Sequence, residues 1–181
     1  RVQDFVIEQD IKNVFLIARW SYYTDGGYDS SNIQYLKSGK LNKLDKSNSR
    51  LVFKNSLEET LKFYKSNGIK VHLITQIPSQ KVDAKDAYFQ AYRNKNNNSD
   101  IALDKKLYEF SVDRDIHEKL QFHTKSLFEL NSLNMDIYDF DDTFCKEKCL
   151  IGNSKGSFYY DDNHLSSSGA SLLKENIISI F

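Results

Sequence analysis

The sequence predicts an α/β fold with three layers, α/β/α, built around a central and mainly parallel sheet. Short apolar runs at 13–19, 69–77 and 135–140 have the length of buried strands. Segments with apolar residues at helical spacing separate these runs, as in the βαβ units of a parallel sheet. The chain has 181 residues, of which 40% are hydrophobic, so a single domain with its own core is expected.

The first elements are the end of a helix, at about 2–11, and the strand at 13–19. The continuous apolar run predicts that this strand is buried on both faces. Its carboxyl end carries Arg19, Trp20 and Ser21. Ligands of open α/β sheets bind beyond the carboxyl ends of strands, so we expect these side chains near a ligand. The alternatives are that Trp20 is a core aromatic and that Arg19 forms a structural ion pair.

Residues 22–48 predict a long loop that can hold a small hairpin. A helix is predicted at 49–66, because its apolar residues recur at helical spacing. Asn67-Gly68 then favours a helix end. The apolar residues of this helix are Phe53, Leu57, Leu61 and Tyr64.

The strand at 69–77 ends before the only proline, Pro78, and a helix is predicted at 81–92. The asparagine-rich segment 94–99 predicts a loop. A longer helix is expected from 112 to about 133, with His117 and His123 as packing residues. We also interpret His72, inside the second strand, as structural. The apolar positions of the longer helix are Val112, Ile116, Leu120, Leu127 and Leu130.

Three carboxylates, those of Asp139, Asp141 and Asp142, lie at the end of the strand at 135–140. Such a group can hold a divalent cation, but a solvated turn is the more common arrangement, and we predict no metal and no other cofactor. Cys145 and Cys149 follow. They can form a disulfide if their loop allows the geometry, which would fit an oxidising compartment. Two free thiols are the alternative, and no second Cys/His pair supports a zinc site.

Bulk charge argues against a nucleic-acid partner. Lys+Arg and Asp+Glu are equal at 25 each, and no basic stripe is present. No apolar run reaches the length of about 18 residues that a membrane-spanning helix needs.

The segment after 157–160, a predicted short strand, has the strongest chemical signal. Asp161 precedes His164 by three residues on one turn, and a helix with an inward apolar stripe follows. A carboxylate at this spacing can hold the imidazole in one tautomer and stabilise the imidazolium that forms when the ring takes a proton. The pair predicts two members of a catalytic triad.

The segment Asp161-Asp162-Asn163-His164-Leu165-Ser166, followed by Gly169-Ala170, resembles the D-x-x-H-L-S…G-A block of SGNH-type esterases and acyltransferases. The closest likeness is to the extracytoplasmic SGNH domain fused behind acyltransferase-3 membrane proteins, which O-acetylate surface polysaccharides. Val14 to Ser21 is similar to the apolar strand of that family, which ends in A-R-W, and Cys145-x-x-x-Cys149 matches its common cysteine pair. The resemblance covers nearly all of the chain and implies an SGNH/flavodoxin-like fold.

The resemblance implies that His164 is the base, that Asp161 orients it, and that Asp162 is not catalytic. Arg19 and Trp20 stand where other SGNH enzymes have a G-x-N-D block, which makes them candidate oxyanion or substrate ligands. The nucleophile of the family is a serine in an upstream G-D-S motif, which this sequence lacks. The segment Gly27-Tyr28-Asp29-Ser30 is similar to this motif. No predicted strand precedes the segment, so we do not take Ser30 as the nucleophile. We therefore expect a single domain, 1–181, truncated before its nucleophile block.

The implied function is transfer of an acyl group, in particular acetyl, to hydroxyls of a cell-surface polysaccharide such as lipopolysaccharide O-antigen. The implied partners are the polysaccharide acceptor, an acyl donor, and a fused or associated membrane acyltransferase domain. The implied location is periplasmic or extracytoplasmic, tethered to the inner membrane. A carbohydrate O-acetylesterase is one alternative, because water can replace the sugar hydroxyl. A non-catalytic glycan-binding or docking module of the same fold is the other.

Overall fold

The computed structural model describes residues 2–28, 33–39, 43–94 and 99–180. It has the predicted α/β architecture with a central parallel sheet. The chain forms two compact units, the first of Arg1–Gln76 and Leu120–Asp139, the second of Ile77–Lys119 and Phe140–Phe181. In the described ranges, no helix combines the length and the apolar character that crossing a membrane requires.

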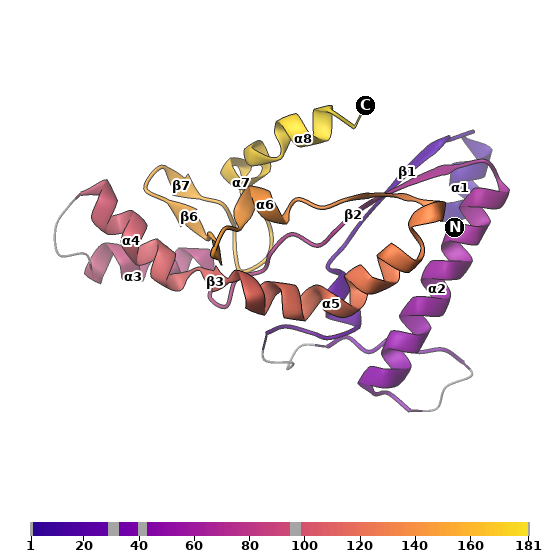
Figure 1. Ribbon diagram of the computed structural model, residues 1–181, viewed down its shortest axis with the longest axis horizontal. Coiled ribbons are helices and arrows are strands. Elements are labelled where there is room, and N and C mark those ends of the chain that lie inside the picture. The colour runs from indigo at the N-terminus through magenta and orange to yellow at the C-terminus, as the bar shows by residue number, and fades with distance from the viewer. Residues whose placement is uncertain (1, 29–32, 40–42, 95–98, 181) are drawn as a thin grey trace. The chain divides into compact units, whose positions relative to one another are not determined.

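The sheet of the first unit contains β1 (Asn13–Ile17), β2 (Lys70–Ile74) and β4 (Asp136–Tyr138), in the order β1-β2-β4. All neighbours are parallel, and β1 and β2 run side by side (Figure 1). The three predicted strands are therefore present, although each is shorter than its apolar run. Residues at the ends of those runs belong to loops beyond the sheet.

One face of this sheet packs against helices of the same unit. Val71 and Leu73 of β2 lie in the hydrophobic core with residues of α1 (Val2–Glu8), α2 (Lys46–Ser66) and α5 (Arg114–Leu130). The predicted apolar stripe of α2 faces this core. These buried residues of α2 are Phe53, Leu57, Leu61 and Tyr64.

The ends of α2 follow from its sequence. The Asp45 side chain accepts a hydrogen bond from the Asn48 backbone N–H (2.8 Å), which caps the amino terminus one turn earlier than predicted. Gly68 has a φ of +66°, a conformation that glycine adopts without strain, and it ends the helix as predicted.

The other face of the sheet is aromatic and polar. The ring of Phe15 stacks on His72, with the ring centroids 4.7 Å apart. The two His72 ring nitrogens contact the Tyr138 hydroxyl (3.0 Å) and Asn13 Oδ1 (3.1 Å). His72 is thus held on both sides within the sheet, in agreement with its structural interpretation.

One prediction for this unit is wrong. The first strand is not buried on both faces, since Ile17 is 65% exposed. The reason is that β1 lies at an edge of the described sheet, whereas β2 is central. Residues 22–48 form no hairpin in their described part. A 3-10 helix, η1 (Trp20–Tyr23), begins this segment, and its described remainder lacks a strand.

The second unit is built from short elements. Strands β3 and β5 pair antiparallel, as do β6 and β7. In chain order the elements of this unit, with the start of α5, are α3 (Ala84–Asn94), α4 (Asp100–Phe110), β3 (Val112–Asp113), α6 (Asp141–Phe144), β5 (Lys148–Cys149), β6 (Gly152–Asn153), β7 (Gly156–Ser157), α7 (Ser167–Leu172) and α8 (Lys174–Ile178). A second 3-10 helix, η2 (Ser132–Asn134), belongs to the first unit.

The helix predicted from residue 112 begins later. Val112 pairs with Cys149 in the β3–β5 ladder, so α5 begins at Arg114. Here a tertiary strand pairing overrides the helical periodicity. Leu130, expected on the inward face, is 80% exposed at the helix end. Helix α4, which the Ser99 side chain caps, is not among the predicted elements. The predicted loop at 94–99 falls mostly on residues 95–98, outside the described residues.

The last elements also differ from the prediction. Strand β7 ends at Ser157, so the predicted strand at 157–160 is shorter. The final helix is split into α7 and α8 at Leu173. Leu173 is buried while Ile177 and Ile178 are exposed, so no continuous inward stripe forms.

Candidate active site

Asp161 and His164 lie on a closed turn of the second unit. The Tyr160 N–H donates to the His164 carbonyl (2.7 Å), and Tyr159 and Leu165 form an antiparallel bridge. The two ends of the turn are thus paired with each other. Backbone pairing therefore keeps the turn in one conformation although its side chains reach solvent.

The carboxylate of Asp161 uses both of its oxygens within the turn. Oδ1 accepts the backbone N–H groups of His164 (2.8 Å) and Asn163 (2.9 Å). Oδ2 lies 2.7 Å from Nδ1 of His164. The structure thus brings the two residues of the sequence prediction into direct contact.

The charge of Asp161 determines the tautomer of His164. Partial burial alone would raise the pKa of Asp161, but the N–H donors of His164 and Asn163 and the imidazole outweigh it and lower this pKa to about 2. A carboxylate only accepts, so Nδ1 carries the proton and the lone pair of the ring is on Nε2. The His164 side chain is 68% exposed, and no described side chain hydrogen-bonds its Nε2 atom. This arrangement leaves Nε2 able to accept a proton from a hydroxyl.

The low pKa of Asp161 predicts a contribution to stability that depends on pH. Because the folded-state pKa lies below the usual value near 4, the charged carboxylate stabilises the fold above about pH 4. This contribution, about 1 to 2 kcal/mol for a partly exposed group, is lost as the pH falls towards 2. Urea unfolding at several pH values measures it. Asp161→Asn is the control, and equal acid sensitivity of both proteins would contradict the assignment.

The helix after the turn explains the remainder of the motif. Ser166 caps α7, since its Oγ accepts from the Gly169 N–H (3.1 Å) and donates to the Ser157 carbonyl (2.5 Å). Gly169 is buried against the backbone of Phe158. A Cβ atom at position 169 would lie 2.0 Å from the Phe158 carbonyl oxygen. Ser166 and Gly169 therefore hold α7 against Ser157 and Phe158, the residues shortly before the turn.

Gln80 supports the turn from a buried position that the sequence analysis missed. Its backbone N–H donates to the Asp162 carbonyl (2.6 Å), and its Nε2 donates to the Cys149 carbonyl (3.0 Å). Its Oε1 accepts from the Val112 N–H (3.3 Å). One side chain thus connects the second cysteine to β3, while its backbone holds the turn. The only sequence signal for Gln80 is its place soon after the second predicted strand.

Gln80→Ala is expected to lower the free energy of unfolding by about 2 to 4 kcal/mol, because it leaves the Cys149 carbonyl and the Val112 N–H buried without partners. Chemical denaturation measures this change. Gln90→Ala, at an exposed position of α3, is the matched control and should stay within about 0.5 kcal/mol of the unchanged protein. Equal effects of the two substitutions would show that the Gln80 side chain does not support the turn.

A disulfide joins Cys145 and Cys149, whose Cα atoms are 3.9 Å apart. It closes the short loop between α6 and β5. Arg114 holds the same loop, since its Nη1 donates to the Cys145 carbonyl (3.2 Å) and pairs with Asp142 (2.8 Å). The loop is thereby fixed by one covalent bond and one guanidinium.

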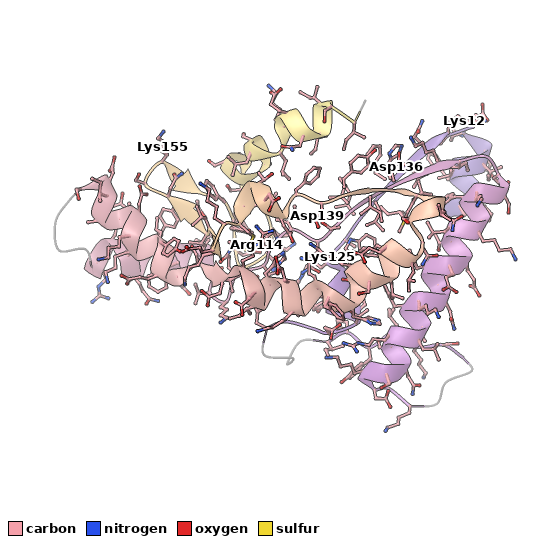
Figure 2. All side chains as sticks on the ribbon, viewed as in Figure 1. Lys12, Arg114, Lys125, Asp136, Asp139 and Lys155 are labelled. Atoms are coloured by element: carbon pink, nitrogen blue, oxygen red, sulfur yellow. A yellow bond between two sulfur atoms is a disulfide. The ribbon has the colours of Figure 1, made fainter. Side chains whose placement is uncertain are left out.

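The three aspartates near the end of β4 pair with separate cationic or basic groups. Asp139 pairs with Lys125 (2.5 Å; Figure 2). Asp141 contacts Nε2 of the buried His117 (2.9 Å), and Asp142 pairs with Arg114. Within the part of the chain that the structure describes, no group of three His, Cys, Asp or Glu side chains is arranged to hold a metal ion.

Arg19 and Trp20 belong to the first unit, whereas the Asp161–His164 pair belongs to the second. The indole N–H of Trp20 donates to the Ile74 carbonyl (2.8 Å), and its ring packs edge-on against Phe128. The Arg19 guanidinium lies over the Tyr22 ring (4.5 Å), and its buried Nε has no partner among the described residues. Trp20 thus makes core contacts, and Arg19 has a donor that described groups do not use. Ser30 lies outside the described residues.

Comparisons with known proteins identify a family and a similar fold. A family model described as "SGNH domain (fused to AT3 domains)" matches residues 1–179. Among solved structures, the chain is similar to the periplasmic domain of a lipopolysaccharide acetyltransferase from Salmonella ser. Paratyphi A. The match has 13% identity and a TM-score of 0.52, and it covers 93% of this chain and 84% of that chain. At this identity the likeness shows the fold. The comparison with curated proteins finds no match.

Proposed function

The chain belongs to the family of SGNH domains fused to AT3 domains, and from this premise we propose that it transfers acetyl groups to hydroxyls of a cell-surface polysaccharide, such as lipopolysaccharide O-antigen. The family supports acyl transfer and an associated membrane acyltransferase domain. The contact between Asp161 Oδ2 and His164 Nδ1 (2.7 Å) carries the proposal, because it leaves Nε2 free to act as a base.

The proposed reaction has two steps. A serine that precedes this sequence in the protein attacks the acyl carbonyl of the donor while His164 takes its proton, and His164 then returns this proton to the leaving group. In the second step a sugar hydroxyl attacks the acyl-serine, and its proton passes through His164 to the serine oxygen. Asp161 stabilises the imidazolium in both steps. The free Nε of Arg19 supports a role for this residue as a substrate or oxyanion ligand. Trp20, the next residue in the sequence, is proposed for the same role.

We place the domain on the extracytoplasmic side of the inner membrane, in the periplasm, tethered by the membrane acyltransferase domain. The family's fusion to AT3 domains supports this location. The Cys145–Cys149 disulfide supports it as well, since such bonds persist in oxidising compartments. In this arrangement the membrane domain supplies the acyl group, and the SGNH domain passes it to the glycan.

A partition experiment with the full-length protein tests the proposal. The protein receives isotope-labelled 4-nitrophenyl acetate together with surface polysaccharide of the host, and labelled polysaccharide and free acetate are measured over time. Acetyl transfer predicts labelled polysaccharide that increases with acceptor concentration. Release of acetate alone, with removal of acetyl groups from acetylated polysaccharide, would instead identify an esterase. Binding of polysaccharide without either reaction would identify a docking module.

A further inference from the structure

The second unit contains a pocket of about 510 Å³ that does not include Asp161 or His164 in its lining. Its volume falls in the range of small-ligand pockets, about 300–1,000 Å³. Apolar groups form most of the lining, among them Phe144, Leu150 and the disulfide cysteine Cys145. Charged side chains and the Tyr108 ring complete it. The pocket thus has the mixture of apolar and polar groups that a small ligand requires.

The charges that line this pocket balance. Two carboxylates, of Asp142 and Glu147, are matched by two ammonium groups, of Lys146 and Lys148, so the formal sum is zero. An anionic or cationic ligand therefore gains no net attraction from these groups. A neutral ligand with many hydroxyls can use carboxylate and ammonium groups together, because a hydroxyl both donates and accepts hydrogen bonds.

Most of these polar groups are held in place by other residues. The Tyr108 hydroxyl donates to Glu147 (3.0 Å), and this bond raises the pKa of the phenol. Lys148 donates to the Ser111 carbonyl (3.0 Å) and lies over the Tyr108 ring, with its Nζ 5.5 Å from the ring centroid. Asp142 pairs with Arg114. Binding would therefore require little reordering of these side chains.

The pocket is connected to the acid–base turn through aromatic packing. The Phe144 ring contacts Phe158 (centroids 6.5 Å apart) and Tyr159 (6.2 Å), the residues that precede the turn. Phe144 thus contributes to the pocket on one side and to the support of the turn on the other.

We propose that this pocket binds a neutral sugar of the acceptor polysaccharide, at a position other than the sugar that receives the acyl group. The C–H face of a sugar ring would pack on the exposed Tyr108 ring, and its hydroxyls would bond Glu147, Lys146 and Asp142. The proposal rests on the proposed function for the identity of the ligand. Its site and residues are separate from those of the reaction.

Binding of neutral monosaccharides tests the pocket without catalysis. Saturation-transfer-difference NMR is recorded with glucose, galactose, mannose and rhamnose, and with glucuronate and glucosamine as charged probes. At least one neutral sugar should bind better than both charged probes, and Tyr108→Ala should weaken its binding at least about tenfold. Phe89→Ala, an exposed aromatic outside the lining, is the matched control. Failure of every neutral sugar, preference for a charged probe, or unchanged binding by Tyr108→Ala would overturn the proposal.

A kinetic test separates this site from the reaction. In the full-length protein, Tyr108→Ala should raise KM for polysaccharide at least about tenfold with kcat unchanged. Hydrolysis of 4-nitrophenyl acetate should also stay unchanged, which a damaged fold would not allow. His164→Ala should leave sugar binding intact. If acyl transfer is absent but sugar binding depends on Tyr108, the proposed pocket is supported and the proposed reaction is contradicted. If acyl transfer occurs but sugar binding does not depend on Tyr108, only the proposed pocket is contradicted.

Discussion

Replacement of His164 with alanine is expected to lower the rate of acyl transfer about 10³- to 10⁴-fold. The reason is that the imidazole, held by Asp161 through Nδ1 (2.7 Å), is the only base that the proposed reaction uses. Initial rates of acetyl transfer to polysaccharide by the full-length protein measure the effect. Because the His164 side chain is 68% exposed, the free energy of unfolding should change by no more than about 1 kcal/mol.

Asp162→Asn is the matched control for this experiment. Asp162 lies on the same turn, but its side chain does not contact the imidazole; it accepts a hydrogen bond from the Asn163 amide. The rate of acyl transfer by Asp162→Asn should stay within about twofold of that of the unchanged protein. If His164→Ala keeps more than about a tenth of the rate, His164 is not the general base.

Gly169→Ala is expected to destabilise the protein by about 3 kcal/mol and to reduce acyl transfer. The added Cβ would lie 2.0 Å from the Phe158 carbonyl oxygen and 3.1 Å from a Leu165 methyl carbon, so the backbone must shift. The first turn of α7 would move, and with it Ser166 and the end of the His164 turn. Alanine favours a helix over glycine by about 1 kcal/mol, so a loss of stability would isolate the steric effect.

Urea unfolding of Gly169→Ala is compared with that of Gly39→Ala. A Cβ at Gly39 meets no atom within 4 Å, so this variant should stay within about 0.5 kcal/mol of the unchanged protein. A Gly169→Ala protein as stable as Gly39→Ala would show that α7 does not need its close approach to Phe158.

The contact between Asp161 and His164 and the central strands could be predicted because their signals are local. Asp161 and His164 are three residues apart, and the turn between them is closed by its own backbone hydrogen bonds. Strand β1 corresponds to a continuous apolar run, β2 and β4 correspond to short segments rich in apolar residues, and α2 has a regular stripe with a cap and a terminal glycine. Neighbouring residues determine each of these features.

The features that the sequence does not predict depend on partners that are distant in sequence. Val112 continues a helical pattern but pairs with Cys149, and Gln80 is buried by its contacts with both of these residues. Tyr108 belongs to the pocket only because Glu147 and Lys148 lie beside it. α4 has its own cap at Ser99, but a neighbouring helix and β6 cover its apolar residues. No periodicity in the sequence indicates these pairings.

Labelling of the full-length protein with a fluorophosphonate, which reacts with activated serines, tests the central claim most directly. Intact mass and peptide mapping should show one adduct, on a serine that precedes residue 1 of this sequence, and His164→Ala should abolish it. Asp162→Asn should label normally. The absence of an adduct, or an adduct that persists in His164→Ala, would contradict the proposal that His164 and Asp161 activate a serine for acyl transfer.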